Sequence, residues 1–186
     1  MNLIIDGVPT QVNISGLRYN INYDFRNCLL FENLLNNDDL SQEDKLYGAI
    51  NIFFGDQYIE DYEEAFKKII WFYTCGKEIK KNTEKNTKPI FSYEIDDCYI
   101  FAAFMEVYKI DLTIEKLHWW KFKALFDALP DTCYLNKIIS YRAVKINNNM
   151  TDSEKKFYRN MKKLFELPDN RTKEEKEADF ADTLFG

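Results

Sequence analysis

The run from His118 to Phe126, His-Trp-Trp-Lys-Phe-Lys-Ala-Leu-Phe, constrains the fold more than any other stretch of the chain. With about 100° of rotation per residue, the apolar residues in and around this run fall on two separate faces of one helix. The two faces carry Ile114, Leu117, Leu125 and Ala128 on one side and Trp119, Phe122 and Phe126 on the other. A helix that is apolar on two sides packs between neighbours. We therefore expect the central helix of a bundle, beginning at Asp111 or Thr113 and ending at Pro130.

Apolar residues recur at spacings of three and four in several further segments, which is typical of amphipathic helices. Capping residues and stop signals place these helices at about 22–35, 41–55, 59–75, 92 or 96 to 108, 131–143 and 151–167. The expected N-caps are Asn22 or Asp24 for the first helix, Ser41 for the second, Ser92 or Asp96 for the fourth and Thr151 for the last, and Gly55 is the expected stop of the second. The last of them is amphipathic, and its apolar residues are expected to face inward: Phe157, Met161, Leu164 and Phe165.

A small hairpin is expected at the N-terminus. Short apolar or alternating runs at Leu3–Ile5 and Gln11–Ile14 flank Asp6-Gly7, a dipeptide that favours tight hairpin turns. Only 6 Gly and 4 Pro in 186 residues argue against an all-β fold, which needs many turn residues. We therefore predict a mainly α fold: a single-domain helical bundle over residues 1–168 with an N-terminal β-hairpin, then a disordered acidic tail over 169–186. The stretch 76–89 is expected to be a mobile loop within the bundle.

No catalytic, cofactor-binding or metal-binding residues are expected. The only histidine, His118, is interpreted as a hydrogen-bonded packing residue rather than a base. The four cysteines stand alone, with no C-x-x-C pair, which argues against zinc and disulfides: Cys28, Cys75, Cys98 and Cys133. The acid pairs Asp38-Asp39 and Asp96-Asp97 stand at helix ends, where capping explains them.

Charge and hydropathy limit the possible partners. A net charge of −6 argues against general binding of nucleic acid, because such binding depends on clustered cations. The N-terminus has no signal-peptide pattern and no apolar run approaches the length that spans a membrane, so we expect a soluble intracellular protein.

Two surfaces are candidates for binding a protein partner. Trp71 lies on the charged side of its helix, where it is either covered by a neighbouring loop or in contact with a partner. The last helix carries a basic face, and the acidic tail ends in an apolar set. The candidate residues on these two segments are Lys156, Arg159, Lys163, Leu184 and Phe185. Docking of the tail on the basic face of a neighbouring copy would give a weak homo-oligomer, and a solvated tail is the alternative.

Several short sequence motifs occur in a fixed order along the chain. They are Asp24-Phe-Arg-Asn27, Trp71-Phe-Tyr-Thr-Cys-Gly-Lys77, Ile110-Asp-Leu-Thr113, Leu117-His-Trp-Trp-Lys-Phe-Lys-Ala-Leu-Phe126, Tyr141-Arg-Ala143, Lys155-Lys-Phe-Tyr-Arg159 and Leu167-Pro-Asp169. This set resembles a family of small proteins from long-tailed phages and prophages of Gram-positive bacteria, regarded as tail-assembly chaperones. The resemblance covers about Ile21 to Asp169, and the run with two adjacent tryptophans is its most specific part.

The resemblance implies a non-enzymatic role in the cytoplasm of the bacterial host. Such a protein binds the long, hydrophobic tape-measure protein and keeps it soluble until subunits of the tail-tube protein polymerise around it. The alternative is a small phage or prophage adaptor that binds one folded protein of the bacterial host. A tape-measure gene immediately downstream would favour the first role, and an isolated early gene the second.

Overall fold

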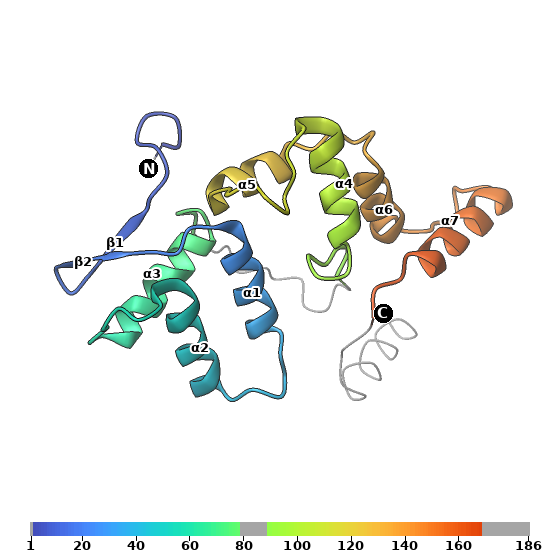
Figure 1. Ribbon diagram of the computed structural model, residues 1–186. Coiled ribbons are helices and arrows are strands. Elements are labelled where there is room, and N and C mark those ends of the chain that lie inside the picture. Colours follow the sequence, from blue (N-terminus) through green and yellow to red (C-terminus); the bar gives the residue numbers. More distant parts are fainter. Residues whose placement is uncertain (1, 79–88, 169–186) are drawn as a thin grey trace. The chain divides into compact units, whose positions relative to one another are not determined.

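The computed structural model describes residues 2–78 and 89–168, which form helices and one hairpin (Figure 1). The strands are β1 (Gln11–Ile14) and β2 (Leu17–Asn20). The helices are α1 (Phe25–Leu35), α2 (Gln42–Phe54), α3 (Tyr62–Tyr73), α4 (Asp97–Tyr108), α5 (Trp119–Asp127), α6 (Tyr134–Ala143) and α7 (Asp152–Leu164). The predicted fold class, mainly α with a small N-terminal hairpin, is confirmed.

The chain divides into two compact units, and the division falls inside α4. The first unit comprises Met1–Lys80 and Phe101–Leu129, and the second comprises Lys81–Ile100 and Pro130–Gly186. The expectation of one domain over residues 1–168 stays a prediction. Most of the expected loop, at 79–88, and the whole expected tail, at 169–186, lie outside the described residues.

The hairpin uses a different turn from the one that the sequence suggested. β1 pairs antiparallel with β2, and Ile14 faces Leu17 across a turn in which Ser15 and Gly16 have φ angles of 49° and 84°. The expected first strand at Leu3–Ile5 is wrong, because residues 2–6 fold back on themselves. The Asn2 side chain accepts hydrogen bonds from the N–H groups of residues 4 and 5, an arrangement that competes with strand pairing.

Three of the expected helix starts are confirmed by their caps. The Asp24 side chain accepts a hydrogen bond from the Arg26 N–H at the start of α1. Ser41 and Thr151 open α2 and α7 with complete capping boxes. These caps need only residues two or three positions apart, so the sequence alone defines them.

The expected central helix is much shorter than predicted. Helix α5 begins at Trp119, where His118 is the N-cap, and residues 111–118 lie outside it. Ile114, assigned to an inner face, is 74% exposed. The two-face pattern therefore overestimated the helix at its N-terminal end.

The core of the first unit is aromatic and is centred on Phe122 of α5. The Phe122 ring stacks on Phe25 of α1, with centroids 4.7 Å apart, and on Phe104, with centroids 5.0 Å apart. Phe31, Phe53 and Phe72 are fully buried in the same unit. The run of the chain that looked central in the sequence is therefore central to this unit, although its helix is short.

The second unit contains a buried ion pair between Asp96 and Arg142. The guanidinium donates to both carboxylate oxygens at 2.6 and 2.8 Å, and the Asp96 side chain is 0% exposed. Arg142 also donates to the carbonyl oxygens of Phe165 and Ile90. Asp96 was interpreted as a capping residue, and the partner that accounts for its burial was missed.

Helix α7 does not bury its apolar face. None of its residues is buried, and Phe157 and Leu164 are 47% and 68% exposed. The expectation that these two side chains face inward is wrong. Phe165, just after the helix, is half-buried and stacks with Tyr141 at a centroid distance of 6.2 Å.

Candidate protein-binding surfaces

Both tryptophans of α5 bind the C-terminal end of α3. The Trp119 indole N–H donates to the Tyr73 carbonyl at 2.7 Å, and the Trp120 indole N–H donates to the Phe72 carbonyl at 2.8 Å. The last carbonyls of a helix have no partner within the helix. The Trp119 indole binds one of them, that of Tyr73, and the Trp120 indole adds a second donor to the Phe72 carbonyl, which also accepts from the Cys75 N–H at 3.1 Å. The adjacent tryptophans therefore hold α3 and α5 together.

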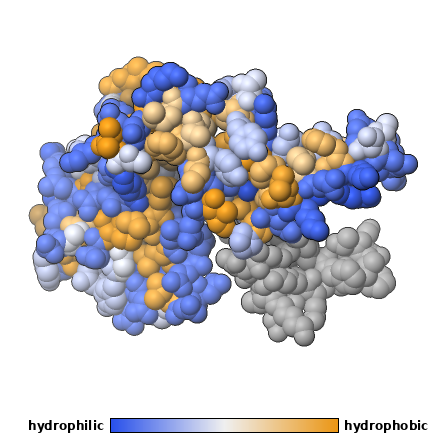
Figure 2. All heavy atoms as spheres, turned by 45° about the vertical axis from the view of Figure 1, so that its right-hand side comes forward, coloured by the Kyte–Doolittle hydropathy of each residue, from blue (hydrophilic) through white to orange (hydrophobic). Residues whose placement is uncertain are grey.

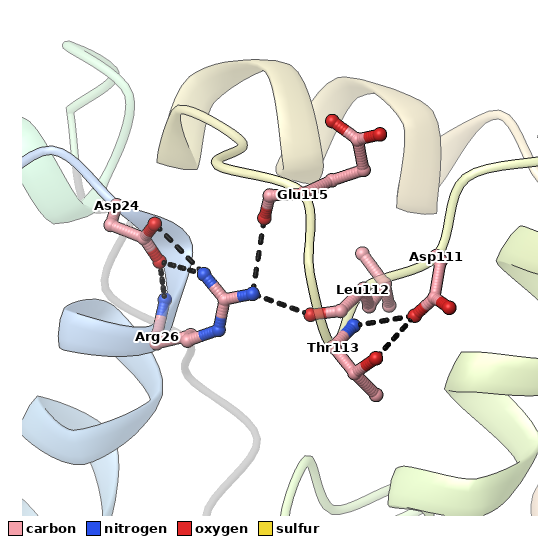
Figure 3. A network of polar contacts seen from close by, with 6 residues as sticks. All are labelled: Asp24, Arg26, Asp111, Leu112, Thr113 and Glu115. Atoms are coloured by element: carbon pink, nitrogen blue, oxygen red, sulfur yellow. Dashed lines mark hydrogen bonds and ion pairs between the residues drawn. The ribbon is translucent and has the colours of Figure 1, made fainter.

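Arg26 connects the start of α1 to the segment before α5 (Figure 3). Its guanidinium pairs with Asp24 at 2.9 Å and donates to the carbonyl oxygens of Leu112, at 2.6 Å, and Glu115, at 3.0 Å. The Phe25 N–H donates to the Leu117 carbonyl on the same segment. Short motifs that carry the resemblance thus meet in one network, which holds the backbone of the segment before α5 against the start of α1.

His118 uses both of its ring nitrogens. Nδ1 accepts a hydrogen bond from the Trp120 N–H at 3.0 Å, and Nε2 lies 2.9 Å from the Pro9 carbonyl oxygen. Burial lowers the pKa of His118, and the charge of Lys121 lowers it further, against the opposing effect of the Pro9 carbonyl. The ring is thus neutral at pH 7 and donates through Nε2. The interpretation of His118 as a hydrogen-bonded packing residue is confirmed.

Two of the cysteines, Cys28 and Cys75, lie in surroundings that disfavour the thiolate form. Burial raises the pKa of the Cys28 thiol above its ordinary range and that of Cys75 to about 11. Over 2–78 and 89–168, no group of three or more His, Cys, Asp or Glu residues is placed to hold a metal ion. In the same residues, no helix is long and apolar enough to cross a membrane.

Trp71 borders an open hollow between α3 and the hairpin. The ring is half-buried and meets Trp120 edge to face, with centroids 5.4 Å apart. The hollow has a volume of about 420 Å³ and is lined by Gln11, Val12, Asn13, Glu64, Lys67, Lys68 and Trp71. The α5 tryptophan covers one part of Trp71, and another part stays accessible to a partner.

A second hollow lies on the other side of α3. It has a volume of about 320 Å³ and is lined by Leu35, Gln42, Lys45, Leu46, Glu63, Phe66 and Lys67. Lys67 borders both hollows. Neither hollow could be predicted from the sequence, because each depends on side chains from elements that are distant in the chain.

Helix α7 exposes an apolar pair beside a row of cations. Lys156, Arg159 and Lys163 are all exposed and follow one another at spacings of three and four, so they share one face. Phe157 and Leu164 lie seven positions apart and share a neighbouring face, also exposed. Figure 2 shows hydrophobic residues reaching the surface of the chain among hydrophilic ones. Such a mixed surface suits a partner helix with an apolar stripe and acidic flanks.

The candidate residues from the sequence are divided between the units. Trp71 belongs to the first unit, and Lys156, Arg159 and Lys163 belong to the second. Leu184 and Phe185 lie outside the described residues. A role in partner binding stays a prediction for all six. Sequence reasoning missed the two exposed residues Phe157 and Leu164, since amphipathic spacing does not tell whether an apolar face is covered.

Comparison with curated proteins and with solved structures finds no match. A family model described as Bacteriophage Gp15 protein matches residues 4–167, which span every helix and strand of the described residues. The chain therefore belongs to the Bacteriophage Gp15 protein family.

Proposed function

We propose that this phage protein is a non-enzymatic tail-assembly chaperone, which binds the tape-measure protein in the cytoplasm of the bacterial host. Membership of a bacteriophage family supports a role in the phage life cycle. The assignment as a tail-assembly chaperone rests on the short sequence motifs that resemble those of tail-assembly chaperones of long-tailed phages and prophages. The tail-tube protein is then a second partner, met when it polymerises around the tape-measure protein.

The observation that carries the proposal is the exposed apolar face of α7. Phe157 and Leu164 are 47% and 68% exposed, although they lie on a helix that opens with a complete capping box. Exposed apolar side chains on an ordered helix are typical of a surface that binds another helix. A long, hydrophobic and helical tape-measure protein offers many such stretches, so several copies of a chaperone can bind along it.

The test is co-expression with the tape-measure protein of the same phage, followed by affinity capture of the tagged chaperone. We expect the wild-type protein to capture the tape-measure protein and the double variant Phe157→Ser/Leu164→Ser to capture much less. The matched control is Leu30→Ser, which removes a 55% exposed leucine from α1 and should leave capture unchanged. Thermal melts of all variants check that the fold is kept.

The alternative, an adaptor for one folded host protein, makes a different prediction for this experiment. In that case the wild-type protein would not capture the tape-measure protein at all. Equal capture by the wild-type protein and the double variant would agree with the chaperone function but would show that the binding surface is not on α7.

A further inference from the structure

Helix α7 leaves an apolar stripe exposed along one side. The Phe157 ring meets Tyr141 edge to face, with centroids 5.9 Å apart, and is still 47% exposed. Leu164, which is 68% exposed, lies seven positions further and therefore on the same side of the helix. Large apolar side chains in line on an ordered helix are typical of a surface that another segment covers.

The cations of α7 differ in whether they have a partner. Lys155 lies 3.9 Å from the Asp152 carboxylate, and Lys162 donates to the Arg142 carbonyl at 2.6 Å. Three others are exposed, and their side chains form no ion pair or hydrogen bond within residues 2–78 and 89–168: Lys156, Arg159 and Lys163. Unpaired cations beside an apolar stripe favour an occupant that is both acidic and apolar.

This chain contains a segment of that composition at residues 177–186, which read Glu-Ala-Asp-Phe-Ala-Asp-Thr-Leu-Phe-Gly. The segment carries Glu177, Asp179 and Asp182 but no lysine or arginine. Apolar residues recur in it at the spacings of three and four that are typical of one helix side: Ala178, Phe180, Ala181, Leu184 and Phe185. The segment thus matches the surface of α7 in both charge and apolar character.

The segment also begins within reach of that surface. Helix α7 ends at Leu164, and the structure describes the chain as far as Pro168. The residues that connect Pro168 to Glu177, 169–176, can span about 27 Å when fully extended. A helix of 13 residues, such as α7, is about 20 Å long. Covalent geometry therefore allows the segment to lie along α7 of its own molecule.

A contact within one molecule is favoured over a contact with a second copy. Pairs of exposed charges are individually weak and are screened by salt, so this contact needs a high local concentration of its two halves. Joining two binding partners through a short stretch of chain raises their effective concentration to the millimolar range. Association of two copies lacks this advantage.

We propose that residues 177–186 bind the exposed face of α7 in the same molecule, with their apolar side chains against Phe157 and Leu164 and their carboxylates beside the three unpaired cations. The segment then covers the surface that the proposed function assigns to the tape-measure protein, so the two compete for α7. This competition rests on the proposed function, whereas the contact itself does not.

The test is zero-length crosslinking of the full-length protein with a carbodiimide, which joins an ammonium group to a carboxylate that it contacts. We expect crosslinks from Lys156 and Lys163 to the acidic residues of 177–186, located by mass spectrometry in the monomeric fraction. The matched control lysine is Lys137, which is exposed on α6 in the same unit and should give none.

Two pairs of substitutions test whether the contact is specific. Leu184→Ser/Phe185→Ser in the segment and Phe157→Ser/Leu164→Ser in α7 should each abolish the crosslinks, because both remove apolar contacts and keep every lysine and carboxylate. The matched control, Leu30→Ser in α1, should keep the crosslinks. Circular dichroism checks that all of these proteins are folded.

An equal mixture of isotope-labelled and unlabelled protein tells a contact within one molecule from a contact between copies. We expect crosslinked peptide pairs in which both members are labelled or both are unlabelled. Pairs with one labelled member would place the segment on a second copy and overturn the proposal.

Two further results would overturn the proposal. They are the absence of crosslinks from Lys156 and Lys163, and crosslinks that persist in both pairs of serine substitutions, since such crosslinks would reflect only the short connection between the segment and α7.

The competition is tested separately by capture of the tape-measure protein. A face that is covered part of the time binds with a correspondingly lower affinity, so Leu184→Ser/Phe185→Ser should capture more tape-measure protein than the wild type does. Equal or lower capture by this variant would refute the competition. Crosslinking needs no partner, so a wild-type protein that captures no tape-measure protein contradicts the proposed function alone.

Discussion

At the scale of single residues, His118 shows how one side chain can fix the start of a helix and the path of a distant segment. Its Nδ1 accepts the first free N–H of α5, and its Nε2 binds the carbonyl of Pro9, far away in sequence. The Tyr23 ring stacks on the imidazole, with centroids 5.2 Å apart. The bond at Nδ1 requires the neutral ring, because a protonated imidazole has no acceptor there, whereas the Nε2 bond to the Pro9 carbonyl is possible in both forms.

This dependence predicts a loss of stability in mild acid. The pKa of His118 is lowered in the folded protein, mainly by burial, so protons bind more tightly to the unfolded chain. The contribution of His118 to the free energy of unfolding is therefore complete above the unfolded pKa, about 6.5, and falls as the pH drops through that value toward the folded pKa.

The measurement is urea unfolding over a pH series for the wild-type protein and for His118→Asn. Asparagine keeps a capping acceptor at the start of α5 but has no charge to gain. The difference in stability between the two proteins should shrink or reverse below about pH 6.5. Parallel stability curves across this range would show that His118 does not titrate against the fold.

At the scale of elements, what the sequence predicted well was local. The capping boxes at Ser41 and Thr151, the cap at Asp24 and the stop at Gly55 each depend on residues within one turn, and all four are present. The error at the central helix has a long-range cause. Residues 111–118 have helical spacing, yet Arg26 from α1 binds two of their carbonyls, and the helix starts only where His118 can cap it.

The end of α3 shows the same long-range control and gives a testable consequence. Gly76 has a φ of 69°, and a Cβ atom there would lie 3.3 Å from Trp71 Nε1 and 3.4 Å from the Trp120 ring. Gly16 in the hairpin turn has a φ of 84°, and a Cβ atom there would meet nothing within 4 Å. The backbone conformation disfavours alanine at both sites, by about 1–2 kcal/mol.

We therefore expect Gly76→Ala to destabilise the protein more than Gly16→Ala, since it must also displace one of the two tryptophans. Chemical unfolding gives both free energies, and tryptophan fluorescence should shift for Gly76→Ala alone. Equal losses of stability with unchanged fluorescence would mean that the tryptophan contact adjusts freely.

At the scale of the whole molecule, each unit is stabilised by an arginine that binds residues far away in the sequence. Arg26 binds the segment before α5 in the first unit, and Arg142 binds Asp96 and the carbonyls of Ile90 and Phe165 in the second. These groups lie far away in the sequence from the two arginines that bind them, so these contacts could not be predicted from residue spacing. The motif Tyr141-Arg-Ala143 contributes to the resemblance, but the sequence alone does not indicate the ion pair of its arginine.

The buried pair predicts strong coupling between Asp96 and Arg142. Removal of one partner leaves a buried charge, which costs about 3–5 kcal/mol, whereas replacement of both by apolar residues can cost far less. We expect Asp96→Leu and Arg142→Met to be more destabilising singly than the double variant is. A double-mutant cycle by urea unfolding measures this. Additive losses would show that the two side chains do not interact energetically.

The candidate surfaces could be predicted only in part. The cations of α7 follow from helical spacing, and so does an apolar stripe beside them. The exposure of Phe157 and Leu164 does not, because it depends on what the rest of the chain leaves uncovered.

The most direct measurement for the proposed chaperone function is the solubility of the tape-measure protein of the same phage, expressed alone and together with this protein. Sedimentation of cell extracts separates soluble from aggregated chains. We expect the tape-measure protein to be found largely in the pellet when it is expressed alone and in the supernatant when it is expressed with this protein. The variant Phe157→Ser/Leu164→Ser should fail to keep the tape-measure protein soluble, whereas Leu30→Ser should keep it soluble. A tape-measure protein whose distribution is the same with and without this protein would contradict the proposal.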